Sequence, residues 1–250
     1  MPIYGPQLEK GTGRRVVGHR PAAPGTVRKE LGTLQAAVNY CAAEGHTLAA
    51  PRVTLPPKPE TTGRALTRAE AAKLIRAARS IGAEHIARFI LVSLYTGTRR
   101  DATLALCLHG PNAKGGWFDL ERGVLYRRGT GETDSAKRRT PAPIPRPLLA
   151  HARRWRASGQ VWAVEWRGLR VGSIKTAWRS TVTAAGLSWA PTPHTLKHTA
   201  ISWAIENGMK LETAAAYFGT SAATIERTYW HHSPHYLADA VAIMERRVRR

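Results

Sequence analysis

The chain has 250 residues and a formal net charge of +21, with 29 arginines against 9 lysines. This length is enough for one large or two modest domains with a real hydrophobic core. Because guanidinium groups match phosphate oxygens in pairs, the excess of arginine indicates a nucleic acid partner rather than a membrane. The alternative is a basic protein whose arginine content reflects GC-rich coding.

Cysteine usage and hydropathy exclude two further classes. Cys41 and Cys107 are the only cysteines, so a disulfide framework is not indicated and a reducing compartment fits. No apolar run approaches the ~18 residues that a membrane span needs, and the first residues do not resemble a signal peptide. We expect a soluble, cytoplasmic protein without a membrane partner.

The N-terminal quarter contains one predicted helix and a linker. Residues 1–24 are rich in Gly, Pro and Arg and are interpreted as a basic arm. Thr26 is a good N-cap for a helix that ends near Gly45 with one buried face. Its apolar residues alternate at spacings of four and three: Val27, Leu31, Leu34, Val38 and Cys41. Pro51 to Gly63 is a proline-rich linker and the best domain boundary.

Two helices follow the linker. Thr67 and Glu70 form a capping box that opens the first, and the second, residues 83–95, is apolar enough to lie inside the fold. Gly97 then permits a tight turn, and Arg99 follows it. From the residues alone, Arg99 is either part of a site or an ordinary surface ion-pair partner.

The middle of the chain favours a small sheet. Residues 117–120, 124–127 and 138–144 alternate as three short antiparallel strands. The loop before the third strand carries Lys137, Arg138 and Arg139, for which a solvated basic loop is the plain alternative. Helices are expected at residues 147–157 and 173–185, and most of the eight tryptophans have the spacing of core residues.

The C-terminal part places several cations on one helix. Pro193 suits a first helical turn, and Asn207-Gly208 is a stop signal. His194 and Lys197, three residues apart, lie on the same side of the first turn, where free backbone N–H groups favour an anion. A short helix at 211–218 precedes a third that carries Tyr229, which is either a nucleophile or an ordinary packing residue.

Two motifs resemble a known family. The sequence H-T-L-K-H-T at 194–199, followed by F-G-T-S-x-x-T-I-E-R-T-Y-W-H-H-S-P from Phe218, is similar to the C-terminal signature of tyrosine recombinases of the phage integrase type. The stretch T-G-T-R-R-D-A-T-L from Thr96 resembles their first box, T-G-x-R-x-x-E-x-x-x-L. The boxes occur in the family's order, and Tyr229 follows Thr220 at the family's spacing.

The resemblance implies an α+β fold that is mainly helical. Residues 64–250 would form the catalytic domain, with a small three-stranded antiparallel sheet. Residues 51–63 would be the linker, and residues 1–50 a truncated helical core-binding region, since only one good helix precedes the linker where the family has four or five.

The resemblance also implies a mechanism. Tyr229 attacks a DNA phosphorus, which gives a 3′-phosphotyrosyl bond and a free 5′-hydroxyl without ATP, metal or another cofactor. Arg99 and Lys197 neutralise the non-bridging oxygens, and His194 binds the same phosphate or accepts the tyrosine proton. Lys137 protonates the leaving oxygen, and Thr220 donates a weaker hydrogen bond to the phosphate.

Four residues are assigned to DNA contacts outside the chemistry: Arg100, Arg138, Arg139 and His198. The implied partner is double-stranded DNA, bound by a homotetramer. Whether an accessory protein also takes part is left open. The sequence departs from the family pattern where Lys197 replaces an arginine, Thr220 a histidine or tryptophan, and Ala102 an acidic residue, whose role Asp101 is a candidate to take.

Three functions are therefore kept open. The first is a site-specific integrase, the second a degenerate relative that holds DNA without cutting it, and the third a type IB topoisomerase-like relaxing enzyme. A metal site at His231, His232 and His235 is disfavoured because their spacing matches no standard zinc pattern.

Overall fold

The computed structural model describes residues 2–4, 16–19, 21–58, 63–133 and 139–229. For residues 2–4, 16–19 and 229 it describes the backbone only. The chain divides into two compact units, Met1–Thr62 and Gly63–Arg250, which are treated separately below.

The first unit contains one long helix and a strand pair. Helix α1 spans Pro24–Ala43, and strands β1 (Pro2–Tyr4) and β2 (Val16–His19) pair antiparallel. The helix begins earlier than predicted because Pro24 occupies its first turn and Ala23, not Thr26, is the N-cap. The expectation of a buried face is wrong, since α1 has no buried residue. The strands were not predicted in the segment interpreted as a basic arm.

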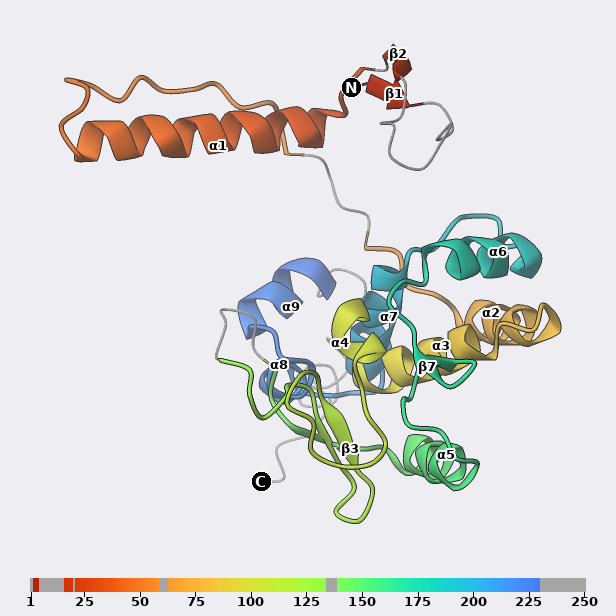
Figure 1. Cartoon of the computed structure of the whole chain (residues 1–250). Helices are drawn as coiled ribbons and strands as arrows, with labels where there is room; N and C mark the ends of the chain where they lie inside the picture. Colours follow the sequence, from red (N-terminus) through yellow and green to blue (C-terminus); the bar gives the residue numbers. More distant parts are fainter. Residues whose placement is uncertain (1, 5–15, 20, 59–62, 134–138, 230–250) are drawn as a thin grey trace, which may run out of the picture. The chain divides into compact units, whose positions relative to one another are not determined.

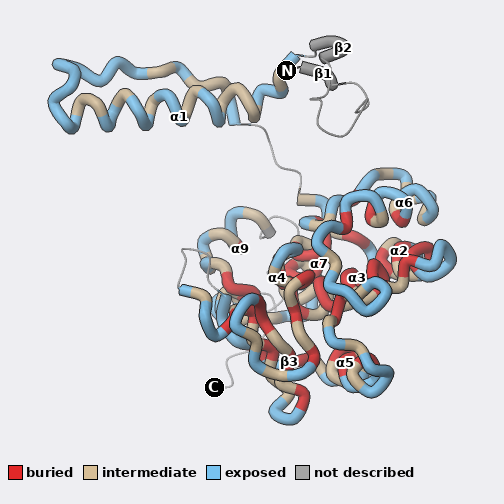
Figure 2. Tube along the Cα trace, viewed as in Figure 1, coloured by how far each residue is buried: buried red, intermediate tan, exposed pale blue. Residues whose placement is uncertain are grey.

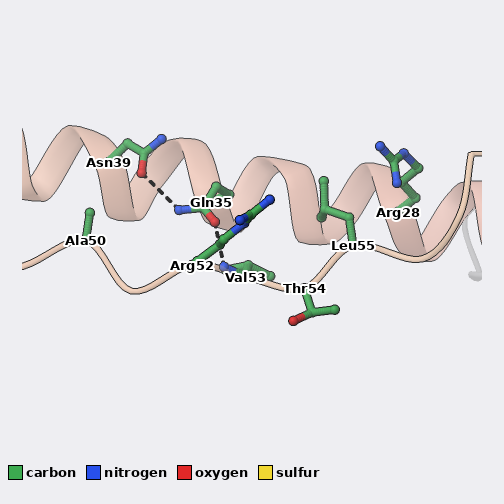
Figure 3. Close-up of a pocket in the computed structure, with 8 residues that line it drawn as sticks. All are labelled: Arg28, Gln35, Asn39, Ala50, Arg52, Val53, Thr54 and Leu55. Carbon is green, nitrogen blue, oxygen red and sulfur yellow. Dashed lines mark hydrogen bonds between the residues drawn. The ribbon is translucent and has the colours of Figure 1, made fainter.

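Gln35 fastens the chain that returns along α1 (Figure 3). Its side-chain amide donates to the carbonyl oxygen of Pro51 at 3.2 Å and to Asn39 Oδ1 at 2.9 Å, and its carbonyl accepts the amide of Val53 at 2.6 Å. Arg28 hydrogen-bonds the carbonyl oxygen of Pro56. The return segment is therefore held by polar contacts and not by a hydrophobic core.

The second unit is mainly helical, with α3 at its centre (Figure 1). Helix α3 packs against five other helices of this unit. The helices of the unit are α2 (Arg68–Ser80), α3 (Glu84–Thr96), α4 (Arg100–Leu104), α5 (Arg146–Ala157), α6 (Lys175–Ala185), α7 (Pro193–Glu206), α8 (Leu211–Phe218) and α9 (Ala222–Tyr229). Figure 2 shows that their buried residues converge on α3 and α7. The predicted helical part of the fold is confirmed, and only α4 was not expected.

Local signals account for the helix ends. The capping box of α2 forms as predicted: the amide of Glu70 donates to Thr67 Oγ1 at 3.1 Å, and Glu70 Oε2 accepts the amide of Thr67 at 2.8 Å. Helix α7 has a second capping box between Thr192 and Thr195. Helices α3, α6 and α8 each end at a glycine in the left-handed conformation.

A three-stranded antiparallel sheet lies beside the helices. Strands β3 (Trp117–Asp119), β4 (Val124–Tyr126) and β5 (Ala142–Pro143) pair in the order β3-β4-β5. Phe118 and Leu125 are opposite one another on its buried face. The predicted small sheet is confirmed, although its third strand has only two residues. A further hairpin, β6 (Glu165–Trp166) with β7 (Leu169–Arg170), was not predicted.

The start of the second unit is tied to α7. Leu66 is 1% exposed, its amide donates to Thr199 Oγ1 at 2.9 Å, and its carbonyl oxygen accepts a hydrogen bond from Trp203 Nε1 at 3.0 Å. Both partners lie on α7, so this helix is anchored at two successive turns. None of the helices in the described part of the chain has the length and apolar character needed to cross a membrane.

Candidate functional site

The turn after α3 delivers Arg99. Gly97 caps α3 with φ of +59°, and a Cβ atom there would lie 2.4 Å from Cδ1 of Phe218. Glycine is required at this position for both reasons, since a side chain would be strained and would collide with the end of α8. Arg99 then becomes the N-cap residue of α4, and the hydroxyl of Thr103 donates to its carbonyl oxygen at 3.2 Å.

Lys197 is a buried cation on α7. It is 7% exposed, and its Nζ donates a hydrogen bond to the carbonyl oxygen of Phe218 at 3.0 Å. Burial, together with the neighbouring charges of Arg99 and Arg127, lowers the pKa of Lys197 to about 7. Near neutral pH the ammonium and the free amine are therefore both populated.

Two histidines lie beside Lys197 on the same helix. The rings of His194 and His198 are in an edge-to-face contact, with centroids 4.6 Å apart. Desolvation, followed by the charges of Lys197 and Arg99, lowers the pKa of His194. Desolvation, followed by His194 and Lys197, lowers the pKa of His198 to about 4. Both imidazoles are thus kept neutral at pH 7, in a form that can accept a proton or a hydrogen bond.

Arg127 joins the ends of three elements and was missed from the sequence. It follows β4 and is 5% exposed. Its Nη2 donates to the carbonyl oxygen of Thr96 at 2.9 Å, its Nε to Thr98 Oγ1 at 3.1 Å, and its Nη1 to the carbonyl oxygens of Thr140 and Tyr217 at 2.9 and 2.7 Å. Burial lowers the pKa of Arg127 to about 10, so it stays charged at neutral pH.

These cations surround a small cavity of about 80 Å³. Its lining includes Arg99, Arg127, Arg139 and Lys197, together with Asp101. A site of this volume holds a few water molecules or one group of the size of a phosphate. Four cationic side chains and only one carboxylate line the cavity, so it favours an anion.

The two carboxylates near the cavity, Asp101 and Glu132, pair with Arg100 and Arg139. Asp101 Oδ1 accepts a hydrogen bond from Nε of Arg100 at 2.7 Å, and both side chains are exposed. Asp101 is therefore engaged with Arg100 instead of Arg99. Glu132 Oε2 binds Arg139 Nη1 at 2.6 Å, while its Oε1 accepts the amide of Gly115 at 2.7 Å.

The predicted site residues fall into three groups. Arg99, Lys197 and His194 lie close enough for their charges to act on one another, and His198 and Arg139 lie beside them. Arg100 stands between two lining residues in the sequence but does not itself line the cavity, and it is ion-paired with Asp101. Thr220 is half-buried and lies two residues after Phe218, whose carbonyl oxygen Lys197 binds. The amide of Thr220 donates to the carbonyl oxygen of Ala215 at 3.1 Å.

The remaining predicted residues lie outside the described part of the chain. Lys137 and Arg138 fall in the segment 134–138, and the side chain of Tyr229, at the end of α9, is not described. The three histidines His231, His232 and His235 fall in the segment 230–250.

Ser221 is the observed cap of α9, since its hydroxyl accepts the amide of Thr224 at 3.2 Å.

Comparison with known proteins gives a consistent answer in structure only. No family model matches the chain, and no curated protein matches it. The fold is similar to the crystal structure of XerA recombinase, with 18% identity over 90% of this chain and 85% of that one and a TM-score of 0.53.

It is also similar to the Tn1549 transposon integrase in complex with circular intermediate DNA, with 17% identity over 90% of this chain and 80% of that one and a TM-score of 0.67. A lambda integrase dimer bound to a COC′ core site matches with 17% identity over 82% of this chain and 59% of that one and a TM-score of 0.59. At these identities the likeness establishes the architecture. The chain has the fold of the tyrosine recombinases.

Proposed function

We propose that this protein is a site-specific DNA recombinase of the integrase type, which cuts and rejoins strands through a 3′-phosphotyrosyl intermediate. The observation that carries the proposal is that Arg99 and Lys197 line one small cavity, with His194 close enough for both charges to lower its pKa. Burial and mutual proximity lower the pKa values of Lys197 and His194. Holding these cationic groups close together is unfavourable unless an anion is bound between them.

The residues divide the work at the phosphate. Arg99 and Lys197 neutralise the non-bridging oxygens as charge grows on the pentavalent phosphorus, which preorganised cations stabilise most. His194, held neutral, hydrogen-bonds the phosphate or accepts the proton of Tyr229. Thr220 donates one further hydrogen bond.

The first described residue after the basic loop supports this chemistry. The resemblance assigns protonation of the leaving oxygen to Lys137, and Arg139, two residues later, lines the cavity. The base of that loop is clamped, because Arg127 binds the carbonyl oxygen of Thr140 and Arg139 binds Glu132. Arg100, Arg138, Arg139 and His198 would contact the flanking DNA.

The two units suggest a division of DNA contacts. We propose that residues 64–250 form the catalytic domain and that residues 1–50 bind DNA, with residues 51–63 as the linker between them. The basic side chains Arg28 and Arg52, in the first unit, line a cavity of about 800 Å³ beside α1 (Figure 3). Assembly as a tetramer on double-stranded DNA follows from the resemblance and would be tested by sedimentation with bound target DNA.

A nicked suicide duplex tests the reaction. Wild-type protein is expected to form a covalent adduct that survives denaturing electrophoresis, and Tyr229→Phe is expected to abolish the adduct while DNA binding is kept. Tyr126→Phe is the matched control, because Tyr126 stacks on Trp117 in the sheet and its loss should leave the adduct intact.

Other outcomes identify the alternative functions. Tight binding with no adduct from the wild type would indicate a protein that holds DNA without cutting it. Relaxation of any supercoiled plasmid, without sequence preference, would indicate a type IB topoisomerase-like enzyme.

A further inference from the structure

The ammonium of Lys197 has donors to spare at the cavity. Its Nζ makes one hydrogen bond among the described residues, to the carbonyl oxygen of Phe218 at 3.0 Å. A lysine ammonium has three N–H donors. Two therefore remain for a group bound in the cavity that Lys197 lines. The bond to Phe218 also holds the flexible side chain in one direction, as a proton donor requires.

The other described bases around this cavity are poor proton donors at neutral pH. Arg99, Arg127 and Arg139 carry guanidinium groups, which do not give up a proton in proteins. His194 and His198 are kept neutral by burial and by the cations beside them, so the imidazolium form that could donate a proton is scarce at neutral pH. Lys197 has a proton and can release it near pH 7.

We propose that Lys197, in place of Lys137 to which the resemblance assigns this step, is the proton donor to the leaving 5′ oxygen, in addition to being a positive charge at the phosphate. As the phenol oxygen of Tyr229 bonds to phosphorus, its proton passes to His194 and the P–O5′ bond breaks. The electron pair of that bond stays on O5′, which takes a proton from the ammonium of Lys197. The products are a 3′-phosphotyrosine, a 5′-hydroxyl and a neutral amine, and rejoining runs the same transfers backwards.

This role explains a lysine where the resembled family has an arginine. An arginine would bind the phosphate with two parallel hydrogen bonds but could not protonate the leaving group. A lysine gives up the paired geometry and gains a transferable proton. Burial of Lys197 and the proximity of Arg99 and Arg127 favour that transfer, because all three effects favour the neutral amine.

The inference rests on the proposed function, and the test separates the two. A pool of nicked suicide duplexes with randomised sequence is first incubated with wild-type protein, and duplexes trapped as covalent adducts are sequenced. The selected duplex is then made in two forms, with oxygen or with sulfur at the 5′ bridging position of the scissile phosphate. A thiolate leaves without protonation, so the sulfur form removes the need for a proton donor.

Lys197→Arg and Lys197→Gln are compared with the wild type on both duplexes. We expect each variant to cleave the oxygen duplex about 10²–10⁴-fold more slowly, the usual contribution of a general acid. On the sulfur duplex Lys197→Arg should come within about tenfold of the wild type, because its charge is kept. Lys197→Gln should be rescued less, because its charge is lost. The alkaline limb of the wild-type rate profile should also become shallower on the sulfur duplex, because deprotonation of Lys197 then removes only a charge and no longer a needed proton.

Matched variants keep the result interpretable. Arg99→Lys should slow both duplexes equally, because its role is electrostatic, and a variant that fails to fold would also slow both. Full activity of Lys197→Arg on the oxygen duplex would overturn the proposal. So would rescue by sulfur of Lys137→Ala but not of Lys197→Arg, which would identify Lys137 as the donor. Absence of any adduct from the wild type would instead overturn the proposed function itself.

Discussion

The guanidinium of Arg127 donates a hydrogen bond of 2.7 Å to the carbonyl oxygen of Tyr217, ninety residues further along the chain. The same side chain binds the carbonyl oxygen of Thr96 at the end of α3. One buried cation therefore holds together the turn that carries Arg99 and the helix end that carries the partner of Lys197. The arrangement of the cavity depends on it.

Replacing Arg127 by Met should lower the free energy of unfolding by about 3–5 kcal/mol, because buried carbonyl groups lose their donor. The measurement is urea unfolding followed by circular dichroism. Arg122→Met is the control, since Arg122 is largely exposed and its ion pair to Asp119 is long, at 4.0 Å. A loss from Arg127→Met no larger than that of the control would contradict the structural role.

Gly97→Ala should destabilise the fold more than the same change at Gly82. Both glycines have positive φ, +59° and +71°, so alanine costs about 1–2 kcal/mol of backbone strain at either. At Gly97 the new methyl also meets Phe218, which adds about 1–3 kcal/mol of overpacking, whereas at Gly82 nothing lies within 4 Å. Equal urea midpoints for the two variants would show that the close approach of α8 is not as described.

Lys197→Met should stabilise the DNA-free protein at pH 6 by about 1–4 kcal/mol, because it removes a buried charge. The folded pKa of Lys197, about 7, is below the unfolded value of 10.5, so the unfolded chain binds more protons between these two values. Wild-type stability relative to the variant should therefore rise from pH 7 to 10.5, and the difference should shrink. Thermal melting across this range measures it, and a difference that is flat with pH would contradict a buried, titrating lysine.

Glu70→Gln should destabilise the protein by about 1 kcal/mol at pH 7. The amide of Thr67 and the indole of Trp189, both hydrogen-bonded to the carboxylate at 2.8 Å, lower the pKa of Glu70 below 4.5. This stabilisation is present above pH 4.5 and is lost as the pH falls through the folded pKa. The gap between wild type and variant should thus close in acid, as measured by urea unfolding. Glu226→Gln, on an exposed residue, is the control and should change little at any pH.

The strongest sequence signals were local, and these predicted the fold well. The capping box at Thr67 and Glu70, the stop at Gly208 and the helix broken at Gly219 all appear where expected. Helical period and cap chemistry are properties of neighbouring residues, so a single sequence contains them. The two-residue strands β6 and β7 are too short for their period to be recognised, although Gly168, at φ of +76°, offered a turn signal. Strands β1 and β2 lie in a segment whose Gly, Pro and Arg content favoured an irregular arm.

Helix α1 illustrates the opposite limit. Its apolar residues repeat as in an amphipathic helix, and the helix forms, but none of its residues is buried. Periodicity predicts which residues share a face, while burial depends on what packs against that face. In the described part of the first unit, the return segment is hydrogen-bonded to α1 through Gln35 and Arg28 and buries no apolar residue fully.

The candidate site combines residues that the two motifs identified with a buried arginine that they did not. Arg99, His194 and Lys197 were identified from the boxes, and the cavity brings Arg99 and Lys197 together. Arg127 stands beside an identical residue, Arg128, so composition did not single it out. Strand alternation did contain the signal, since Arg127 follows β4 directly and lies two residues after Leu125, which is fully buried.

The anchoring of Leu66 to Thr199 and Trp203 has a mechanical consequence. Leu66 is the fourth residue of the second unit. A force applied to the backbone before this unit would therefore act on α7 through the two hydrogen bonds of Leu66. That helix bears His194, Lys197 and His198, and tension would therefore reach these three bases within a few residues of entering the second unit.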